Sequence, residues 1–215
     1  MYDFKGKVAM ITGAARKRGI GRATALRLAK EGADIVVVGK YRPPELFPAW
    51  EKREGWKGLD SLVEEVVAMG RKGLAVTGDI SVKEEADEMV AKAIKKFGHV
   101  DILVNGAALH NVNDNRPLFE MPQDTWNSYL AVNLNGTLYM SLAVARYMKE
   151  RGQGGKIINI SSAKFPGKDN PQYSVSKAAM TRLSQVMALQ WPPTKSMSML
   201  FSLLLCLCQP MGGVK

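Results

Sequence analysis

The stretch Thr12-Gly13-Ala14-Ala15-Arg16-Lys17-Arg18-Gly19-Ile20-Gly21 decides the fold, because it joins an apolar run to a helix-forming segment. The run Val8–Thr12 predicts a buried strand, and Ile20–Glu31, followed by Gly32, predicts a helix. Such a turn lets the backbone approach a pyrophosphate, to which the amino terminus of the helix offers unpaired N–H groups. The turn therefore predicts a dinucleotide cradle, although a tight turn with nothing bound would contain the same glycines.

The turn is two residues longer than is usual, since five residues rather than three separate Gly13 from Gly19. We expect the additional residues, among Arg16–Arg18, to bulge outward. This bulge is basic, so it suits a phosphate group on the adenosine ribose of a bound dinucleotide.

The second predicted strand, Asp34–Val38, is followed by Gly39 and Lys40 rather than by an acid. In dinucleotide-binding sheets an acid at this point binds the ribose 2′-hydroxyl and repels a 2′-phosphate. Because Arg18 and Lys40 are cationic, we expect NADP as the cofactor, with NAD the less favoured choice. The alternative is that both side chains are only solvated and that the long segment after this strand decides the selection.

Strands and helices alternate through the rest of the chain. The pattern predicts strands at Gly73–Thr77, Val100–Val104 and Lys156–Ile160, and helices at Leu59–Met69, Thr125–Lys149, Gln172–Gln190 and from the capping box Ser81–Glu84 to Gly98. Since the strands are continuous apolar runs, we expect an α/β fold, a doubly wound parallel sheet of the Rossmann type in three layers. The segment Gly39–Gly58, with three prolines and two tryptophans, interrupts this pattern as a lid, a clamp on the cofactor or plain elaboration.

The length of 215 residues suits one domain, which we place at residues 1–191, with 192–215 as an atypical tail. The net charge of +10 permits nucleic-acid binding, but the basic residues are scattered and favour a solvated surface with a site for an anionic cofactor. Cys206 and Cys208, the only cysteines, are separated by one residue, which fits neither a disulfide framework nor a zinc site. Because no disulfide framework is implied, a reducing, intracellular setting is the default, and we expect a cytoplasmic protein, with an organellar one as the alternative. We also expect no bound metal.

The tail contains the nearly uninterrupted apolar run Met197–Cys208. This run is shorter than the about 20 residues that a membrane-spanning helix needs, so we expect no membrane span. A buried strand and an interfacial segment both fit its composition.

Tyr173 and Lys177 stand at positions i and i+4 of a predicted helix, so they share one face. A nearby ammonium favours the phenolate and lowers the pKa of tyrosine from about 10, so Tyr173 can exchange a proton with a carbonyl or an alcohol near neutral pH. Ser162, after the fifth strand, would hydrogen-bond the substrate oxygen, and Asn133 would hold a water that links Lys177 to solvent.

The ordered set of the glycine turn, Asp79, Asn105-Gly106-Ala107, Asn133, Ser162, Tyr173 and Lys177 resembles the short-chain dehydrogenase/reductase family over roughly residues 5–190. The long segment after the second strand is similar to that of some hydroxysteroid-dehydrogenase-like members. The resemblance implies an NAD(P)-dependent oxidoreductase, commonly a homo-oligomer, and it selects Ser162 rather than Ser161. Together with the turn and the strand ends, it implies cofactor contacts from Gly13, Arg18, Gly19, Ile20, Gly21, Lys40, Asp79, Ile80, Asn105, Gly106, Ala107, Tyr173 and Lys177.

The chain also departs from the family pattern. Asn105-Gly106-Ala107-Ala108 replaces Asn-Asn-Ala-Gly, the spacing from Ser162 to Tyr173 is two residues shorter than the commonest form, and 192–215 matches none of the family's last strands or its substrate-covering loop. Two hypotheses follow: an NADP-dependent oxidoreductase that transfers a hydride between nicotinamide and the carbonyl or alcohol carbon of a small molecule, or a truncated, non-catalytic homologue that binds dinucleotide or pairs with a full-length relative. We expect His99 and His110 to be surface residues rather than catalysts.

Overall fold

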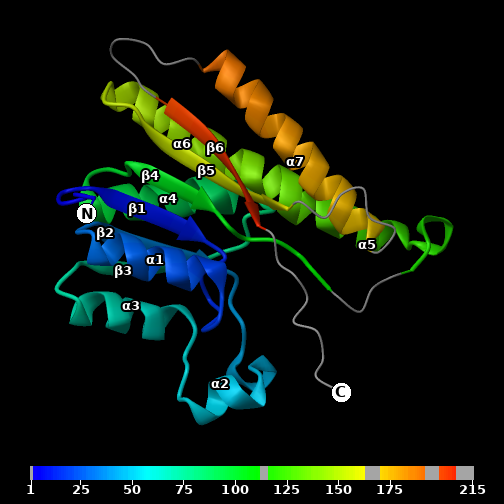
Figure 1. The fold of residues 1–215 in the computed structure, drawn as a ribbon, viewed down its shortest axis with the longest axis horizontal. Coiled ribbons are helices and arrows are strands. Elements are labelled where there is room, and N and C mark those ends of the chain that lie inside the picture. Colours follow the sequence, from blue (N-terminus) through cyan, green and yellow to red (C-terminus); the bar gives the residue numbers. More distant parts are fainter. Residues whose placement is uncertain (1, 112–115, 163–169, 192–198, 207–215) are drawn as a thin grey trace.

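In the computed structural model, six parallel strands form one sheet in the order β3-β2-β1-β4-β5-β6 (Figure 1). The structure describes residues 2–111, 116–162, 170–191 and 199–206, the last range by its backbone alone. The strands are β1 (Val8–Thr12), β2 (Asp34–Gly39), β3 (Gly73–Thr77), β4 (Ile102–Asn105), β5 (Gly155–Ser162) and β6 (Met199–Cys206). This order is that of doubly wound dinucleotide-binding sheets, so the predicted fold class is confirmed.

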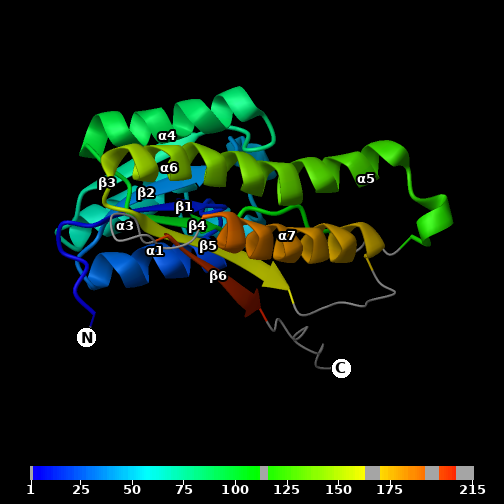
Figure 2. The same ribbon diagram turned by 90° about the horizontal axis from the view of Figure 1, so that it is seen from above.

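Helices cover both faces of the sheet, which gives the three expected layers (Figure 2). Helices α4 and α6 pack on one face and α1 and α3 on the other, while α7 lies along β5 and β6. The α-helices are α1 (Ile20–Lys30), α2 (Ala49–Arg53), α3 (Leu59–Ala68), α4 (Lys83–Phe97), α5 (Gln123–Leu130), α6 (Thr137–Arg151) and α7 (Pro171–Gln190). Two short 3-10 turns, Pro44–Leu46 and Leu118–Glu120, precede α2 and α5.

Strand β2 shows why the sequence builds two cores. Val36 and Val38 belong to the core under α4 and α6, whereas Ile35 and Val37 belong to the core under α1 and α3. All four side chains are completely buried. Because successive side chains of a strand point to opposite faces, a continuous apolar run is what a sheet covered on both sides requires.

Two predicted helix boundaries were wrong. The segment predicted as one helix over 125–149 begins at Gln123, and a π-helical turn, Ala131–Gly136, separates α5 from α6. The predicted capping box at Ser81 does not form, since Val82 is the residue before α4 and Ser81 Oγ donates instead to Asp79 at 2.6 Å. In both places a polar side chain, Ser81 or Asn133, hydrogen-bonds to a loop rather than within a regular helix. The periodicity of apolar residues does not reveal such contacts.

The tail contributes a strand, one of the two possibilities that its composition left open. Strand β6 pairs with β5 in parallel over eight residue pairs, from Gly155 opposite Met199 to Ser162 opposite Cys206. The expectation that the last strands would be missing therefore needs a correction, because a sixth strand occupies the edge beside β5. The eight residues of β6 supply backbone hydrogen-bond partners along the whole length of β5.

Candidate functional site

The expected site residues gather where the parallel strands end at their carboxyl side. The glycine turn follows β1, Lys40 follows β2, Asp79 and Ile80 follow β3, and Gly106 and Ala107 follow β4. Ser162 is the last residue of β5, and Tyr173 and Lys177 lie in the first two turns of α7, which packs against β5. Ligands of open α/β sheets bind in the crevice at this edge.

The Lys177 side chain is held at the end of β5. It is 3% exposed, and its Nζ donates to the carbonyl oxygen of Ile160 at 2.8 Å, two residues before Ser162. The same Nζ lies 5.9 Å from the centre of the Tyr173 ring. The structure thus brings the phenol and its ammonium neighbour to one side of the domain, next to the strand end that carries Ser162, which is itself 6% exposed.

Asn133 links the loop after β4 to α7, the helix that carries Tyr173 and Lys177. Its side chain is fully buried in the π-helical turn, where Oδ1 accepts from Leu109 N at 2.7 Å and Nδ2 donates to Leu109 O at 3.2 Å and to Ser176 Oγ at 2.9 Å. Ser176 Oγ in turn donates to the carbonyl oxygen of Tyr173 at 2.8 Å. Asn133 is therefore connected to Tyr173 through Ser176, a contact that the sequence did not predict, and π-helical turns are frequent at functional sites.

His110 is nearer to the site than the sequence suggested. It is exposed, as expected, but its ring lies against Tyr173 with the two ring centres 4.4 Å apart and the planes at 40°. The imidazole thus covers part of the phenol from the loop after β4. Its position four residues after the post-strand glycine was the available signal, because loops at the carboxyl ends of strands carry ligand contacts in this architecture.

The glycine turn has the geometry that a pyrophosphate needs. Gly13 adopts a φ of +74°, and a Cβ placed there would lie 2.6 Å from the backbone nitrogen of Ala107, so the turn and the loop after β4 approach as only glycine permits. Gly19 precedes α1 without a side-chain cap, and the first turn of α1 contains no acid. In this described part of the chain, the amino-terminal N–H groups of α1 are thus left for an anion, and the residues fit a bound dinucleotide.

Asn105 faces the interior rather than the crevice. Its Nδ2 donates to Ser141 Oγ at 3.0 Å and to Asn159 Oδ1 at 2.9 Å, and Asn159 Nδ2 donates to Ser184 Oγ at 2.8 Å. This buried chain ties β4 and β5 to α6 and α7. Any contact of Asn105 with a cofactor would therefore involve its backbone.

Lys40 and Asp79 form an ion pair across the ends of β2 and β3. Lys40 Nζ lies 2.7 Å from Asp79 Oδ2, and Ser81 donates to Asp79 Oδ1 through both its backbone N and its hydroxyl. Burial alone would raise the pKa of Asp79, but the hydrogen bonds from Lys40 and Ser81 outweigh it and hold this pKa below 3.8. The hydrogen bond to Asp79 and its charge raise the pKa of Lys40 above 10.5, so both groups are ionised at neutral pH.

The segment between β2 and α3 folds back onto the glycine turn. Trp56 Nε1 donates to Ala15 O at 2.9 Å, and Lys17 N donates to Glu51 Oε1 at 3.0 Å. Glu51 is 1% exposed and also pairs with Arg42. The segment therefore holds the glycine turn in place, and its contacts do not decide between a lid, a clamp on the cofactor and plain elaboration. We call this segment the clamp because it holds the turn.

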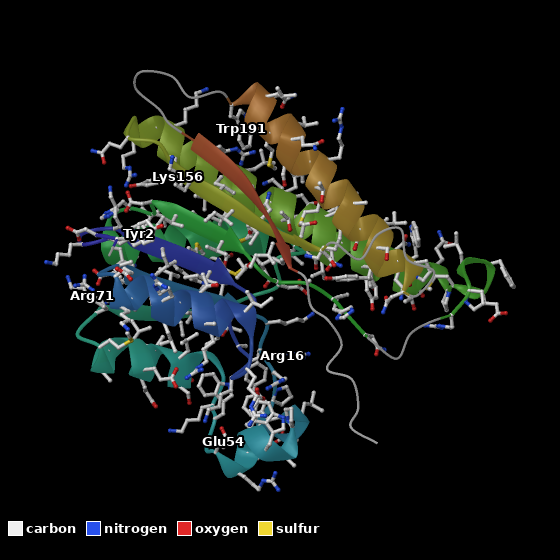
Figure 3. The ribbon with its side chains drawn as sticks, viewed as in Figure 1. Tyr2, Arg16, Glu54, Arg71, Lys156 and Trp191 are labelled. Carbon is white, nitrogen blue, oxygen red and sulfur yellow. The ribbon has the colours of Figure 1, made fainter. Side chains whose placement is uncertain are left out.

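Lys17 and Arg18, two of the three basic residues of the turn, contact a carboxylate and aromatic rings of this clamp. Lys17 Nζ lies 2.6 Å from Glu54 Oε2, and Arg18 Nη2 lies 3.5 Å from Glu54 Oε1. The Arg18 guanidinium also lies 4.2 Å from the centre of the Trp50 ring. Figure 3 shows Arg16 and Glu54 on this side of the molecule, next to α2.

The described ranges contain neither a group of metal-ligating side chains nor a membrane-spanning helix. Nowhere in them do three or more histidine, cysteine, aspartate or glutamate side chains group as metal ligands would. None of the helices there combines the length and the apolar character that crossing a bilayer requires.

The fold and the pairing of Tyr173 with Lys177 at the strand ends place the chain among the dinucleotide-binding α/β oxidoreductases. The sequence profile of the short chain dehydrogenase family matches residues 7–199. The chain belongs to this family, as its motifs suggested, and the match ends at the first residue of β6.

Relatives and solved structures agree with this assignment. The chain is 33% identical over 192 residues to 2-dehydro-3-deoxy-D-gluconate 5-dehydrogenase of Escherichia coli K12. The aligned residues cover 88% of this chain and 68% of that relative. The chain is 35% identical over 189 residues to L-rhamnose 1-dehydrogenase (NAD(P)(+)) of Azotobacter vinelandii, covering 87% and 68%. Carveol dehydrogenase of Mycobacterium avium, solved in complex with NAD, superposes with a TM-score of 0.77 at 27% identity, covering 88% and 67%. Since these relatives are named dehydrogenases, the chain is an NAD(P)-dependent oxidoreductase acting on CH–OH or C=O groups.

Proposed function

We propose that this chain is an NADP-dependent oxidoreductase that transfers a hydride between nicotinamide and the carbonyl or alcohol carbon of a small molecule. The observation that carries the proposal is the position of the Tyr173 ring 5.9 Å from Lys177 Nζ, beside the end of β5. The catalytic unit would lie in residues 1–191, and a cytoplasmic location is part of the proposal, based on the cysteine usage alone.

Each polar residue of the site has a role in the proton transfer. Tyr173 would donate a proton to the substrate oxygen in reduction and remove it in oxidation. The Lys177 ammonium favours the phenolate form of Tyr173, since a nearby positive charge stabilises the ionised phenol. Ser162 would donate a hydrogen bond to the same substrate oxygen as negative charge develops there. Asn133 would fix the position of the loop after β4 relative to α7, through its hydrogen bonds with Leu109 and Ser176.

The residues that would hold the cofactor follow the same edge of the sheet. Gly13, Gly19, Ile20 and Gly21 would bind the pyrophosphate, with Gly106 and Ala107 against the nicotinamide half and Asp79 and Ile80 near the adenine. The bound nicotinamide supplies the hydride in reduction and accepts it in oxidation. Arg18 and Lys40, at the end where the adenosine ribose would lie, support NADP because both are cationic and no acid stands at the end of β2, at Gly39 or Lys40.

The names of the relatives suggest which substrates to try. They include enzymes of a keto sugar acid and of a sugar, and the solved neighbours include an NAD+-bound xylitol dehydrogenase with a TM-score of 0.73. We propose that the substrate is a polyhydroxylated alcohol or its carbonyl counterpart, because several relatives act on compounds of this class.

A spectrophotometric assay tests the proposal. NADPH or NADH is mixed with sugar acids, aldoses, ketoses and simple aldehydes, and the loss of absorbance of the reduced cofactor is followed. We expect oxidation of NADPH with at least one carbonyl compound, and we expect Tyr173→Phe to abolish this turnover while nucleotide binding persists. Turnover of Tyr173→Phe near that of the unmodified chain would refute the role of Tyr173.

The same assay separates the alternative hypothesis. If the folded chain binds NADPH and oxidises it with none of the carbonyl compounds, a homologue that binds dinucleotide without turnover becomes the better description. The feature that favours this alternative is the end of the family match at residue 199, before most of β6.

A further inference from the structure

The end of β2 lies directly against the glycine turn. Gly13 N donates to Val38 O at 2.9 Å, and a Cβ on Gly39 would lie 3.2 Å from the Cβ of Ala15. In doubly wound sheets the adenosine ribose of a dinucleotide lies at this strand end. The basic residues of the turn and Lys40 therefore flank the position of the ribose 2′ substituent.

Two carboxylates of the segment between β2 and α3 reach the turn, and they differ in their surroundings. Glu51 is buried and accepts from Lys17 N at 3.0 Å while it pairs with Arg42, so it fixes the clamp in place. Glu54, which follows α2, has a side chain that is 40% exposed. Solvent therefore reaches Glu54, and a ligand can displace it without opening the core.

Glu54 forms ion pairs with two cations, Lys17 and Arg18. Its Oε2 lies 2.6 Å from Lys17 Nζ and its Oε1 lies 3.5 Å from Arg18 Nη2. The hydrogen bond from Lys17 lowers the pKa of Glu54, with smaller contributions from the charges of Lys17, Arg18 and Arg53, so the carboxylate is ionised at neutral pH. The two carboxylate oxygens of Glu54 thus lie where two oxygens of a phosphate monoester would lie if Lys17 and Arg18 bound it.

The surroundings suit a phosphate better than a hydroxyl. Arg16, Arg18 and Arg42 line a pocket of about 320 Å³ together with Trp50 and Glu51. The Arg18 side chain is 72% exposed and stacks on Trp50 rather than being fixed by further carboxylates in the described part of the chain. A guanidinium placed in this way can turn to a dianion and bind two of its oxygens.

We propose that Glu54 competes with the 2′-phosphate of NADP for Lys17 and Arg18, and that it thereby limits the preference of this chain for NADP over NAD. The inference rests on the proposed nucleotide site and names the residue that sets its specificity. NADP must displace Glu54 from both cations before its phosphate can bind them. NAD presents only a hydroxyl there and leaves the ion pairs intact.

Calorimetric titration of Glu54→Gln with two nucleotides tests the inference. Adenosine 2′,5′-bisphosphate carries the 2′-phosphate and adenosine 5′-monophosphate lacks it. Because exposed ion pairs are weak, we expect the affinity for the bisphosphate to rise only about threefold to tenfold. The affinity for the monophosphate should change by less than about twofold, and the gain should shrink at 1 M salt, where the pairs are screened.

A matched control and a conservative variant sharpen the result. Glu64→Gln removes another exposed glutamate, which pairs with Lys57 at 3.9 Å on α3, and it should change neither affinity. Glu54→Asp keeps the charge on a shorter side chain and should give an intermediate affinity for the bisphosphate. Circular dichroism verifies that the variants are folded.

The possible failures are distinguishable. If both nucleotides bind and Glu54→Gln changes neither affinity, or changes both equally, the inference is wrong while the proposed nucleotide site stands. If neither nucleotide binds to the folded chain or to the variant, the proposed site and the inference fall together.

Discussion

Ser176 lies on α7 and, through Asn133, connects this helix to the loop after β4. Its hydroxyl accepts from Asn133 Nδ2 at 2.9 Å and donates to Tyr173 O at 2.8 Å. Ser176→Ala removes both bonds and leaves Asn133 Nδ2 with Leu109 O alone, at 3.2 Å. We expect a loss of about 1 kcal/mol in the free energy of unfolding and a melting temperature lower by roughly 2–4 °C. The turnover number should fall more than the affinity for nucleotide, because α7 carries Tyr173.

A serine on the surface provides the comparison for Ser176→Ala. Ser128 Oγ also donates to a helical carbonyl, that of Asp124 at 2.7 Å, but it is exposed and its partner lies in the same helix, α5. Ser128→Ala should leave both the melting temperature and the turnover number nearly unchanged. Equal effects of the two variants would contradict a positioning role for Ser176.

The pair Lys40–Asp79 predicts a dependence of stability on pH. The folded-state pKa of Asp79 is lowered, so its stabilising contribution is present above 3.8 and is lost as the pH falls through the folded value. The folded-state pKa of Lys40 is raised, so its contribution is present below 10.5 and is lost as the pH rises through the folded value. Asp79→Asn should therefore be less stable than the unmodified chain at pH 7, and the gap should close in strong acid. Urea unfolding of both proteins between pH 7 and 2 measures this gap, and a gap that stays constant would rule the ion pair out as its cause.

At the scale of elements, the approach of the glycine turn to the loop after β4 is set by Gly13. Gly13→Ala combines a φ of +74° with a Cβ 2.6 Å from Ala107 N, so the two loops would have to separate. Gly70→Ala introduces a similar φ, +75°, at a place where a Cβ has no neighbour within 4 Å. We expect Gly70→Ala to cost about 1 kcal/mol of unfolding free energy and Gly13→Ala at least twice as much. Thermal melts give the comparison, and nucleotide titration should show weaker binding for Gly13→Ala alone.

The elements were predictable where burial decides them. The valine-rich run of β2 and the helix-forming run of α1 were identified from the sequence because a sheet covered on both faces demands such patterns. The π-helical turn at Ala131–Gly136 was not predicted, and the contacts of its buried Asn133 are with Leu109 and Ser176, which are distant in sequence. The same applies to His110, whose neighbour Tyr173 is 63 residues further along the chain (173 − 110).

The cations Lys40 and Arg18 show that the sequence predicts where charges lie but not which groups pair with them. Lys40 and Arg18 were identified as candidates from their positions beside the strand end and the turn. The partner of Arg18, Glu54, depends on how the segment between β2 and α3 folds back, and the partner of Lys40, Asp79, depends on the pairing of β2 with β3. No local pattern encodes either contact. Charge at a site was thus predictable, whereas the degree to which it is already neutralised was not.

At the scale of the whole molecule, β6 closes the edge of β5. Removal of residues 199–215 would turn β5, an inner strand of eight residues, into the edge strand of the sheet, and exposed strand edges promote association between chains. We expect this variant to aggregate in size-exclusion chromatography. Removal of residues 207–215 keeps the β5–β6 ladder and should elute like the unmodified chain. If both shortened chains stay monodisperse, the pairing of β6 with β5 is not what protects this edge.

The π-helical turn between α5 and α6 makes the length of this segment as important as its composition. A regular helix advances by about 100° for each residue, so a single deletion within Ala131–Gly136 would rotate α5 by that angle relative to α6. Asn133 would then leave Leu109 and Ser176 even though every side chain of the site were still encoded. Among natural variants of this chain, we therefore expect one-residue gaps to be rarer here than amino-acid exchanges.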